Sequence, residues 1–155
     1  MNWTVEQMKE DYANEIMQWR YPAPYDFYHL PNTDDVFAAL MNDMYYVVID
    51  DREEMVGFFC TGNEAQVPSG NTVGAYAEDC IDIGLGMKPS LTGNGLGKSF
   101  FGFILDQVQM EEMPFRVTVA TFNQRAICLY GKFGFVQQHT FLSPVGQFVT
   151  MRRNP

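Results

Sequence analysis

Alternation of apolar and polar positions predicts helices and strands that follow one another closely. Residues 4–19, TVEQMKEDYANEIMQW, carry apolar side chains at helical spacing, and Thr4 with Gln7 has the form of a capping box at the helix start. TDDVFAALMND predicts a second, short helix with Thr33 as its N-cap. YYVVID and EMVGFFCTG, rich in β-branched and aromatic residues around the polar turn DREE, predict a hairpin.

The second half of the chain alternates strands with helices. CIDIGLGM, residues 80–87, predicts a strand whose glycines at 84 and 86 indicate a bulge or the close approach of a ligand to the backbone. Residues 95–112 predict a helix, FRVTVATF a strand, and NQRAICLYGKFG a helix that begins at Asn123 and ends at Gly134. FVQQHTFL and QFVTMRR predict a closing antiparallel pair. We therefore expect a mixed α/β sheet with one strand–helix–strand crossover at its centre.

Composition narrows the class of protein. A length of 155 residues with 46% hydrophobic side chains suits one domain, residues 1–155, with one core. We expect no membrane span, because no apolar run approaches the ~20 residues that a bilayer requires. The N-terminus shows no signal-peptide pattern, and the three cysteines form no C-x-x-C pair, so we expect reduced thiols in the cytoplasm. The two histidines are far apart, and we expect no metal.

The net charge of −9 is distributed unevenly along the chain. Residues 1–87 hold three Lys/Arg and sixteen Asp/Glu, whereas residues 88–155 hold seven and three. The balance excludes nucleic acid as an expected partner, because phosphate backbones require clustered basic side chains. Two interpretations of the asymmetry stay open: a solvated acidic surface, or an anion held by the second half and a cation attracted by the first.

The stretch LTGNGLGKS, residues 91–99, is a candidate anion-binding loop. It does not fit the Walker A pattern, because position 92 is Thr, and its glycines at 93, 95 and 97 do not fit G-x-G-x-x-G. Stronger evidence for anion binding is the helix that is predicted to begin at the end of this loop. The free amides and the dipole at the N-terminus of that helix favour a diphosphate.

Two motifs make the chain similar to the GNAT family of acyl-coenzyme A-dependent N-acetyltransferases. The family pattern [Q/R]-x-x-G-x-[G/A] appears as TGNGLG, residues 92–97, with Thr92 in place of Gln or Arg. The pattern N-x-x-A-x-x-L-Y-x-K-x-G-F appears as NQRAICLYGKFGF, residues 123–135. The resemblance covers residues 80–153 well and the first 80 residues only by element order. It implies an α/β (α+β) fold with a bulged central strand and helices on both faces of the sheet.

The resemblance also implies roles for particular residues. The bulged strand would bind the pantetheine arm of acetyl-coenzyme A (acetyl-CoA), and the glycine-rich loop would bind its diphosphate. Tyr130 matches the tyrosine that faces the coenzyme sulfur, and we expect it to hydrogen-bond the departing thiolate. Asn123 would cap its helix and bind the coenzyme or a water. The residues expected to bind the coenzyme are Leu85, Gly86, Met87, Thr92, Gly93, Asn94, Gly95, Leu96, Gly97, Lys98 and Asn123.

The general base and the acceptor are less well defined by the sequence. Some relatives carry a Glu at the position of Thr118, so that base is missing here. Asp82 is a candidate base or, equally, a hydrogen-bonded strand residue. Glu78 and Asp79, just before the predicted strand, are further candidate bases, although the sequence favours solvated loop charges for both. An aromatic segment after the first helix can bind a cationic amine by cation–π attraction, or can staple a loop onto the core. The residues expected to contact the substrate are Trp19, Tyr25, Tyr28 and Glu78.

We therefore expect an N-acetyltransferase that transfers an acetyl group from acetyl-CoA to a primary amine by direct attack in a ternary complex. The acceptor would be a small-molecule amine, a protein N-terminus or a lysine. The alternative is a non-catalytic acyl-CoA-binding sensor or partner module of the same fold, and a P-loop nucleotide-binding protein is a more distant third. Many proteins of the resembled family dimerise, so a homodimer is possible.

Overall fold

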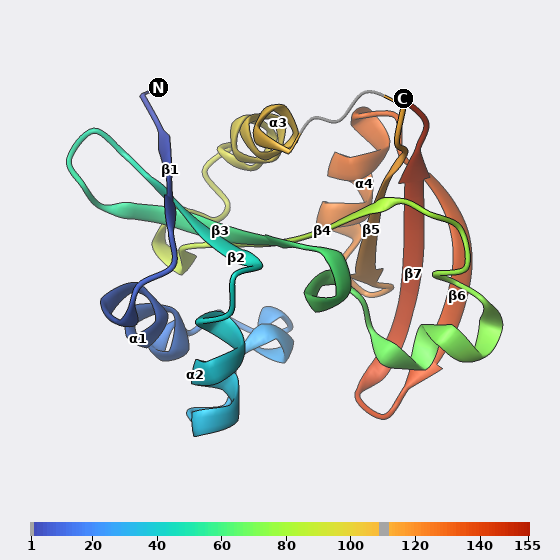
Figure 1. Ribbon diagram of the computed structural model, residues 1–155, viewed down its shortest axis with the longest axis horizontal. Helices are drawn as coiled ribbons and strands as arrows, with labels where there is room; N and C mark the ends of the chain where they lie inside the picture. Colours follow the sequence, from blue (N-terminus) through green and yellow to red (C-terminus); the bar gives the residue numbers. More distant parts are fainter. Residues whose placement is uncertain (1, 109–111) are drawn as a thin grey trace. The chain divides into compact units, whose positions relative to one another are not determined.

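The computed structural model describes residues 2–108 and 112–155. Its seven strands form one mixed sheet in the order β1-β2-β3-β4-β5-β7-β6 (Figure 1), which confirms the predicted mixed α/β fold. The chain divides into two compact units, Met1–Cys60 with Leu85–Gly97, and Thr61–Gly84 with Lys98–Pro155. We call them the first and the second unit. Within the described residues, no helix is both long and apolar enough to cross a membrane.

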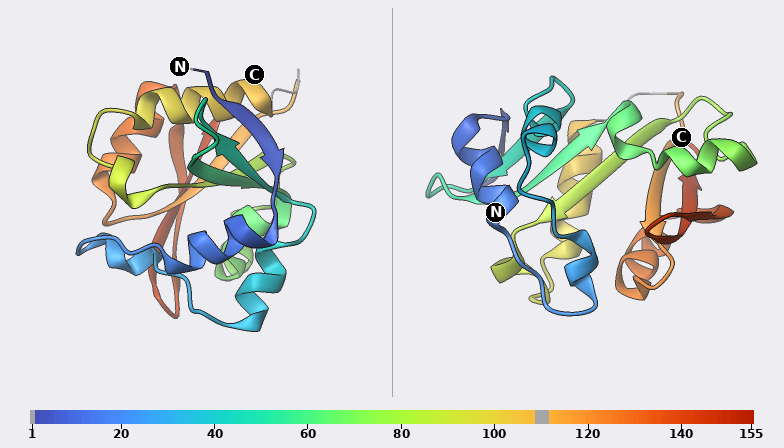
Figure 2. Two further views of the ribbon diagram at one scale, coloured as in Figure 1. Left: turned by 90° about the vertical axis from the view of Figure 1, so that its left-hand side faces the viewer. Right: turned by 90° about the horizontal axis from the view of Figure 1, so that it is seen from below.

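The first unit is a three-stranded antiparallel arrangement covered by two helices. β1 (Thr4–Gln7) pairs with β2 (Tyr45–Ile49), and β2 pairs with β3 (Met55–Thr61). Helices α1 (Glu10–Gln18) and α2 (Asp34–Leu40) lie on one face of the β2–β3 hairpin (Figures 1 and 2). The core between them comprises Met8, Ala13, Ile16, Met17, Trp19, Leu40, Val47, Ile49 and Met55. The predicted hairpin and the Thr33 cap, whose Oγ1 accepts from the Val36 amide at 3.3 Å, are both confirmed.

The predicted capping box at Thr4 and Gln7 is wrong. These residues form the edge strand β1, with Thr4 opposite Ile49 and Gln7 opposite Tyr46, and the helix begins only at Glu10. The pattern S/T-x-x-Q is local, whereas pairing with β2 is made across some forty residues of chain and outweighs the local helical tendency.

The chain makes the strand–helix–strand crossover that the sequence predicts. Ile81–Ile83 of β4 (Ile81–Met87) pair in parallel with Phe115–Val117 of β5 (Phe115–Ala120), and α3 (Gly97–Gln107) connects the two strands. β5 pairs antiparallel with β7 (Gly146–Arg153), and β7 with β6 (Val136–Ser143).

One helix and one long loop complete the second unit. α4 (Gln124–Lys132) follows β5, as predicted, and Gly134 after it has a φ of +89°. The predicted loop after β3 holds two 3₁₀ turns, η2 (Gly62–Ala65) and η3 (Pro68–Val73), and η3 lies against β6 (Figure 2). The predicted helix 95–112 begins at Gly97 instead, and residues 109–111 of its predicted end lie outside the described residues.

Candidate functional site

The end of β4 is packed under an aromatic ring. A Cβ atom built on Gly86 would lie 2.5 Å from Cε1 of Phe58, so the ring occupies the space that a side chain would need. Packing against Phe58 within the first unit therefore accounts for a glycine at this position, an explanation that the sequence could not separate from close approach by a ligand. Leu85, Gly86 and Met87 are half-buried, and their contact with a coenzyme stays a prediction.

The glycine-rich loop adopts a backbone conformation that favours glycine. Gly93 and Gly95 both have a φ of +76°, and apart from the neighbouring residues in the chain no atom of the described residues lies within 4 Å of a Cβ built on either. The glycines serve the backbone conformation there, since packing does not require them. The loop leads into the first turn of α3, where amide groups have no intrahelical partner. An exposed glycine loop followed by a helix of eleven residues can receive an anion such as a diphosphate.

Side chains of the same loop hold its shape. Thr92 closes the short η4 turn (Pro89–Leu91), because its Oγ1 donates to the carbonyl of Pro89 at 2.7 Å. The side-chain amide of Asn94 donates to the carbonyl of Ser90 at 3.3 Å. Thr92 thus has a structural use at the position where the family pattern carries Gln or Arg.

Helix α4 presents Asn123 and Tyr130, both predicted from the second motif. Asn123 is the N-cap, and its Oδ1 accepts from the amide of Ala126 at 3.1 Å. Tyr130 is buried at 8% exposure in an aromatic cluster of the second unit, with its ring centroid 4.8 Å from that of Phe101 and 6.2 Å from that of Phe135. The packing fixes the position of the ring, and the role of its hydroxyl stays a prediction.

Asp82 forms a buried ion pair with Arg116, directly opposite it in the parallel pairing of β4 and β5. Nε of Arg116 donates to Oδ1 at 2.6 Å and Nη2 donates to Oδ2 at 2.8 Å, while the side chain of Gln66 donates to Oδ2 at 2.8 Å. Asp82 is 3% exposed and Arg116 2%. This bidentate geometry is typical of a structural ion pair.

Arg116 has further partners within the second unit. Its Nη1 donates to the carbonyls of Ala75 and Glu78 at 3.3 and 3.1 Å, and its guanidinium lies 4.9 Å from the centre of the Tyr76 ring. Burial by itself lowers the pKa of Arg116, but the hydrogen bonds and the charge of Asp82 outweigh it and raise that pKa above its ordinary value. Arg116 is therefore positively charged at neutral pH.

Arg116 was not singled out from the sequence, although a signal was present. FRVTV and IDI each place one charged residue within an apolar strand, and opposite charges on neighbouring buried strands are expected to pair. The predicted substrate contact Glu78 touches this pair only through its backbone carbonyl, and its exposed carboxylate lies 3.3 Å from Arg152.

Tyr76 and Thr118 form a second polar contact that the sequence did not reveal. Their hydroxyl oxygens are 2.9 Å apart, and the Tyr76 oxygen also accepts from the amide of Val67 at 2.9 Å. The position where some relatives carry a base is thus hydrogen-bonded to a tyrosine of the loop after η3.

The aromatic segment after α1 is part core and part surface. Trp19 is 8% exposed within the first unit's core, and its Nε1 donates to Glu15 at 3.3 Å. Tyr28 is 37% exposed, and Phe27 packs edge-on against it with centroids 5.2 Å apart. Tyr25 is half-buried. Trp19 therefore fits the interpretation of a loop stapled to the core, while Tyr25 and Tyr28 keep surface that an acceptor could reach.

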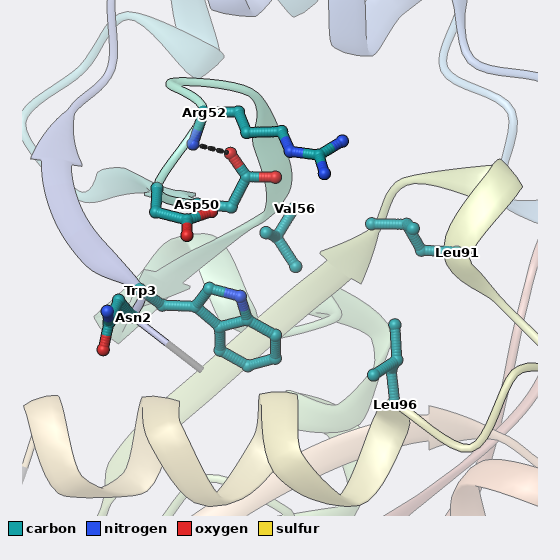
Figure 3. A pocket seen from close by; sticks show the side chains of 8 residues that line it. Asn2, Trp3, Asp50, Arg52, Val56, Leu91 and Leu96 are labelled. Carbon is teal, nitrogen blue, oxygen red and sulfur yellow. Dashed lines mark hydrogen bonds between the residues drawn. The ribbon is translucent and has the colours of Figure 1, made fainter.

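A pocket of ≈ 310 Å³ lies in the first unit beside the β2–β3 turn. The indole of Trp3 and the side chains of Val56, Leu91 and Leu96 point toward one another across it (Figure 3). Its rim is polar and is formed by Asn2, Asp50, Asp51 and Arg52. Of the residues predicted to bind a ligand, Leu96 alone lines this pocket.

Comparison with known protein families gives one match. The model of the Acetyltransferase (GNAT) family matches residues 11–135. That range includes both motifs, and it extends into the first 80 residues, where the sequence resemblance rested on element order alone. A search of curated proteins returned no match.

Solved structures of low sequence identity share the fold. A spermidine N-acetyltransferase SpeG chimera from Vibrio cholerae and hSSAT matches with a TM-score of 0.70 at 16% identity, covering 98% of this chain and 95% of that one. A putative acetyltransferase from Acinetobacter baylyi matches with a TM-score of 0.69 at 14% identity, with coverage of 99% and 93%. An N-acetyltransferase from Staphylococcus aureus Mu50 matches with a TM-score of 0.64 at 17% identity, covering 99% of both chains.

Proposed function

We propose that this chain, which belongs to the GNAT acetyltransferase family, transfers an acetyl group from acetyl-CoA to a primary amine by direct attack in a ternary complex. The observation that carries the proposal is the glycine loop before α3, whose positive φ angles and open surroundings fit a diphosphate. When bound, the coenzyme supplies the thioester, an acyl group already activated for attack. The residues of this chain supply binding, orientation and polar contacts.

Diphosphate binding is assigned to the backbone of residues 93–97 and to the exposed Lys98. The amides of the helix start carry the positive end of the helix dipole, and Lys98 adds a full positive charge in its first turn. Because backbone groups do most of this work, Thr92 in place of Gln or Arg removes at most a side-chain contact. Leu85, Gly86 and Met87 are proposed to receive the pantetheine arm.

Tyr130 is proposed to hydrogen-bond the departing sulfur. Full proton transfer would be uphill by roughly 2 kcal/mol, because a tyrosine has an ordinary pKa of about 10 and a thiol one of about 8.5. A hydrogen bond that strengthens as charge develops on the sulfur lowers the barrier without requiring that transfer.

The sequence left two roles open for Asp82, general base and hydrogen-bonded strand residue. Its geometry supports the second. Both of its oxygens accept hydrogen bonds from a buried guanidinium, so removing a proton from the amine would compete with the ion pair. An amine with a pKa near 10 is about a thousandth neutral at pH 7, and we propose that this neutral fraction is the reacting species.

The acceptor is proposed to be a small cationic amine. Residues 1–87 carry sixteen acidic against three basic side chains, and Tyr25 and Tyr28 offer partly exposed aromatic rings for cation–π contact. Several solved structures with this fold are spermidine N-acetyltransferases, so spermidine and related polyamines come first in an acceptor panel.

The test has two stages that separate an enzyme from a binding module. Calorimetry with acetyl-CoA, with ATP and magnesium as the control ligand, measures binding; release of free thiol with a panel of amines then measures turnover. We expect binding of acetyl-CoA and amine-dependent thiol release. Binding without turnover on any amine would favour the non-catalytic module, and absence of binding would refute the proposal.

A further inference from the structure

The peptide group that joins Met87 to Lys88, at the end of β4, is hydrogen-bonded at both of its polar atoms. Its carbonyl oxygen accepts from the hydroxyl of Tyr21 at 2.7 Å, and its N–H donates to the carbonyl of Val56 at 2.9 Å. Because a peptide group is planar, holding both atoms fixes the orientation of the whole plane. Pro89 follows with a restricted φ, so the strand enters the η4 turn in one direction.

Tyr21 is itself anchored. Its backbone N–H donates to Nε2 of His29 at 2.6 Å, and the two rings stack with centroids 6.1 Å apart. The Tyr21 ring also packs against the core of the first unit. The hydroxyl is therefore held in place from both ends of the residue.

The Met87–Lys88 peptide group, which Tyr21 holds, lies between two segments that are proposed to bind the coenzyme. It comes directly after Leu85–Met87, the proposed pantetheine-binding residues, and shortly before the glycine loop of residues 93–97. Tyr21 belongs to the same segment as Tyr25 and Tyr28, the proposed acceptor contacts. One hydroxyl thus connects the segment proposed to receive the amine with the backbone proposed to hold the coenzyme, all within the first unit.

We propose that Tyr21 is a positioning residue for acyl transfer: its hydroxyl fixes the Met87–Lys88 peptide and thereby orients the backbone groups that receive the coenzyme on either side of it. This inference rests on the proposed function. Tyr21 acts through the backbone and transfers no proton. Burial raises the pKa of Tyr21 to about 12, so its hydroxyl stays protonated and remains a donor at neutral and mildly alkaline pH.

The first test measures the peptide group without any coenzyme. Tyr21→Phe removes the hydroxyl and keeps the ring, and amide hydrogen exchange of Lys88 reports how often its peptide opens. We expect exchange to become about five- to tenfold faster, the change that corresponds to loss of one buried hydrogen bond. Tyr46→Phe is the matched control, because Tyr46 lies on β2 with its ring stacked on Phe59. Unchanged Lys88 exchange in Tyr21→Phe would overturn the inference.

The second test measures turnover. We expect Tyr21→Phe to lower kcat about tenfold at saturating substrates, by the same ratio at each pH between about 6 and 9, because the hydroxyl does not titrate there. A purely structural Tyr21 would lower the melting temperature and leave kcat of the folded protein unchanged. A Tyr21 that transfers a proton would give a ratio that varies with pH. Either result would contradict a positioning role.

The two tests distinguish a failure of this inference from a failure of the proposed function. If the wild-type protein releases no thiol with any amine, the proposed function fails, and with it the catalytic part of this inference. The exchange measurement needs no coenzyme and decides independently whether Tyr21 fixes the peptide. Faster exchange together with unchanged turnover would show that Tyr21 holds the peptide but does not serve the reaction.

Discussion

Replacing Asp82 by asparagine removes one charge of a buried pair and leaves the guanidinium of Arg116 without its counter-ion. The guanidinium keeps its bonds to the carbonyls of Ala75 and Glu78 and its place beside the Tyr76 ring. These groups offer partial negative charge only. The variant therefore measures how much free energy of unfolding is lost when the buried guanidinium has no full negative charge beside it.

The structure sets the scale of the effect. Both partners are nearly inaccessible to water, with side chains 3% and 4% exposed. Removal of one partner of such a pair costs about 3–5 kcal/mol, because an uncompensated charge stays buried. That loss is large against the roughly 5–15 kcal/mol by which typical proteins are stable, so Asp82→Asn should unfold at much lower denaturant concentration.

Urea unfolding followed by circular dichroism measures the difference. Glu78→Gln is the control, since it breaks a partly exposed ion pair with Arg152 in the same unit and should change the free energy of unfolding by less than about 1 kcal/mol. In the double variant Asp82→Asn/Arg116→Met the orphaned charge is gone, so its cost should fall below the sum of the single variants. A loss below about 1 kcal/mol for Asp82→Asn would refute the buried-charge argument.

The same variant tests the base. If Asp82 accepted the amine proton, turnover of folded Asp82→Asn would fall about 100-fold or more. If Asp82 is a structural residue, folded Asp82→Asn should turn over substrate at nearly the wild-type rate.

The free energy of unfolding should not change near neutral pH through titration of Arg116. A group whose pKa is raised by folding contributes its full stability below its ordinary pKa and loses that stability as the pH rises from the ordinary value through the raised one, which for Arg116 lies far into alkali.

Three further variants address the coenzyme site. Tyr130→Phe should lower turnover about tenfold or more while the Kd for coenzyme A, by calorimetry, changes about twofold at most; unchanged turnover would remove Tyr130 from the chemistry. Gly86→Ala should cost about 1–3 kcal/mol in urea unfolding, because its Cβ would meet the Phe58 ring, and Gly86→Ala/Phe58→Leu should recover part of that. Gly95→Ala should lose about 1 kcal/mol to its positive φ and weaken coenzyme binding several-fold. Gly102→Ala is its control, a helical glycine where a Cβ makes ordinary contact at 3.6 Å; equal coenzyme affinity in both would contradict the loop assignment.

Features encoded by neighbouring residues could be predicted from the sequence. The cap at Asn123 and the positive φ at Gly134 are decided within one helix and its ends. The hairpin of β2 and β3 follows from two β-rich runs around a polar turn. Such signals need no knowledge of the rest of the fold.

Features that join distant parts of the chain could not be found in this way. The local sequence of β1 predicts a helix start, because the strand partner that determines its structure, β2, lies about forty residues away. The Asp82–Arg116 pair requires the parallel register of β4 and β5, which places the two residues opposite each other. The Tyr21–Met87 bond spans 66 residues and involves a carbonyl, which has no sequence signature at all.

In a site that binds its ligand through backbone groups, the side chains that matter most are those that hold the backbone in position. At β4 and the glycine loop the proposed ligand contacts are amides and carbonyls, which every residue type carries, so residue identity there matters mainly for conformation. The side chains with specific work are those that fix the backbone: Tyr21 on the Met87–Lys88 peptide, Thr92 on the carbonyl of Pro89, and Asn94 on that of Ser90. At the position where the family pattern carries Gln or Arg, Thr92 holds the turn that precedes the glycine loop. It follows that substitutions of these backbone-holding residues should disturb coenzyme binding and turnover more than their distance from the ligand would suggest.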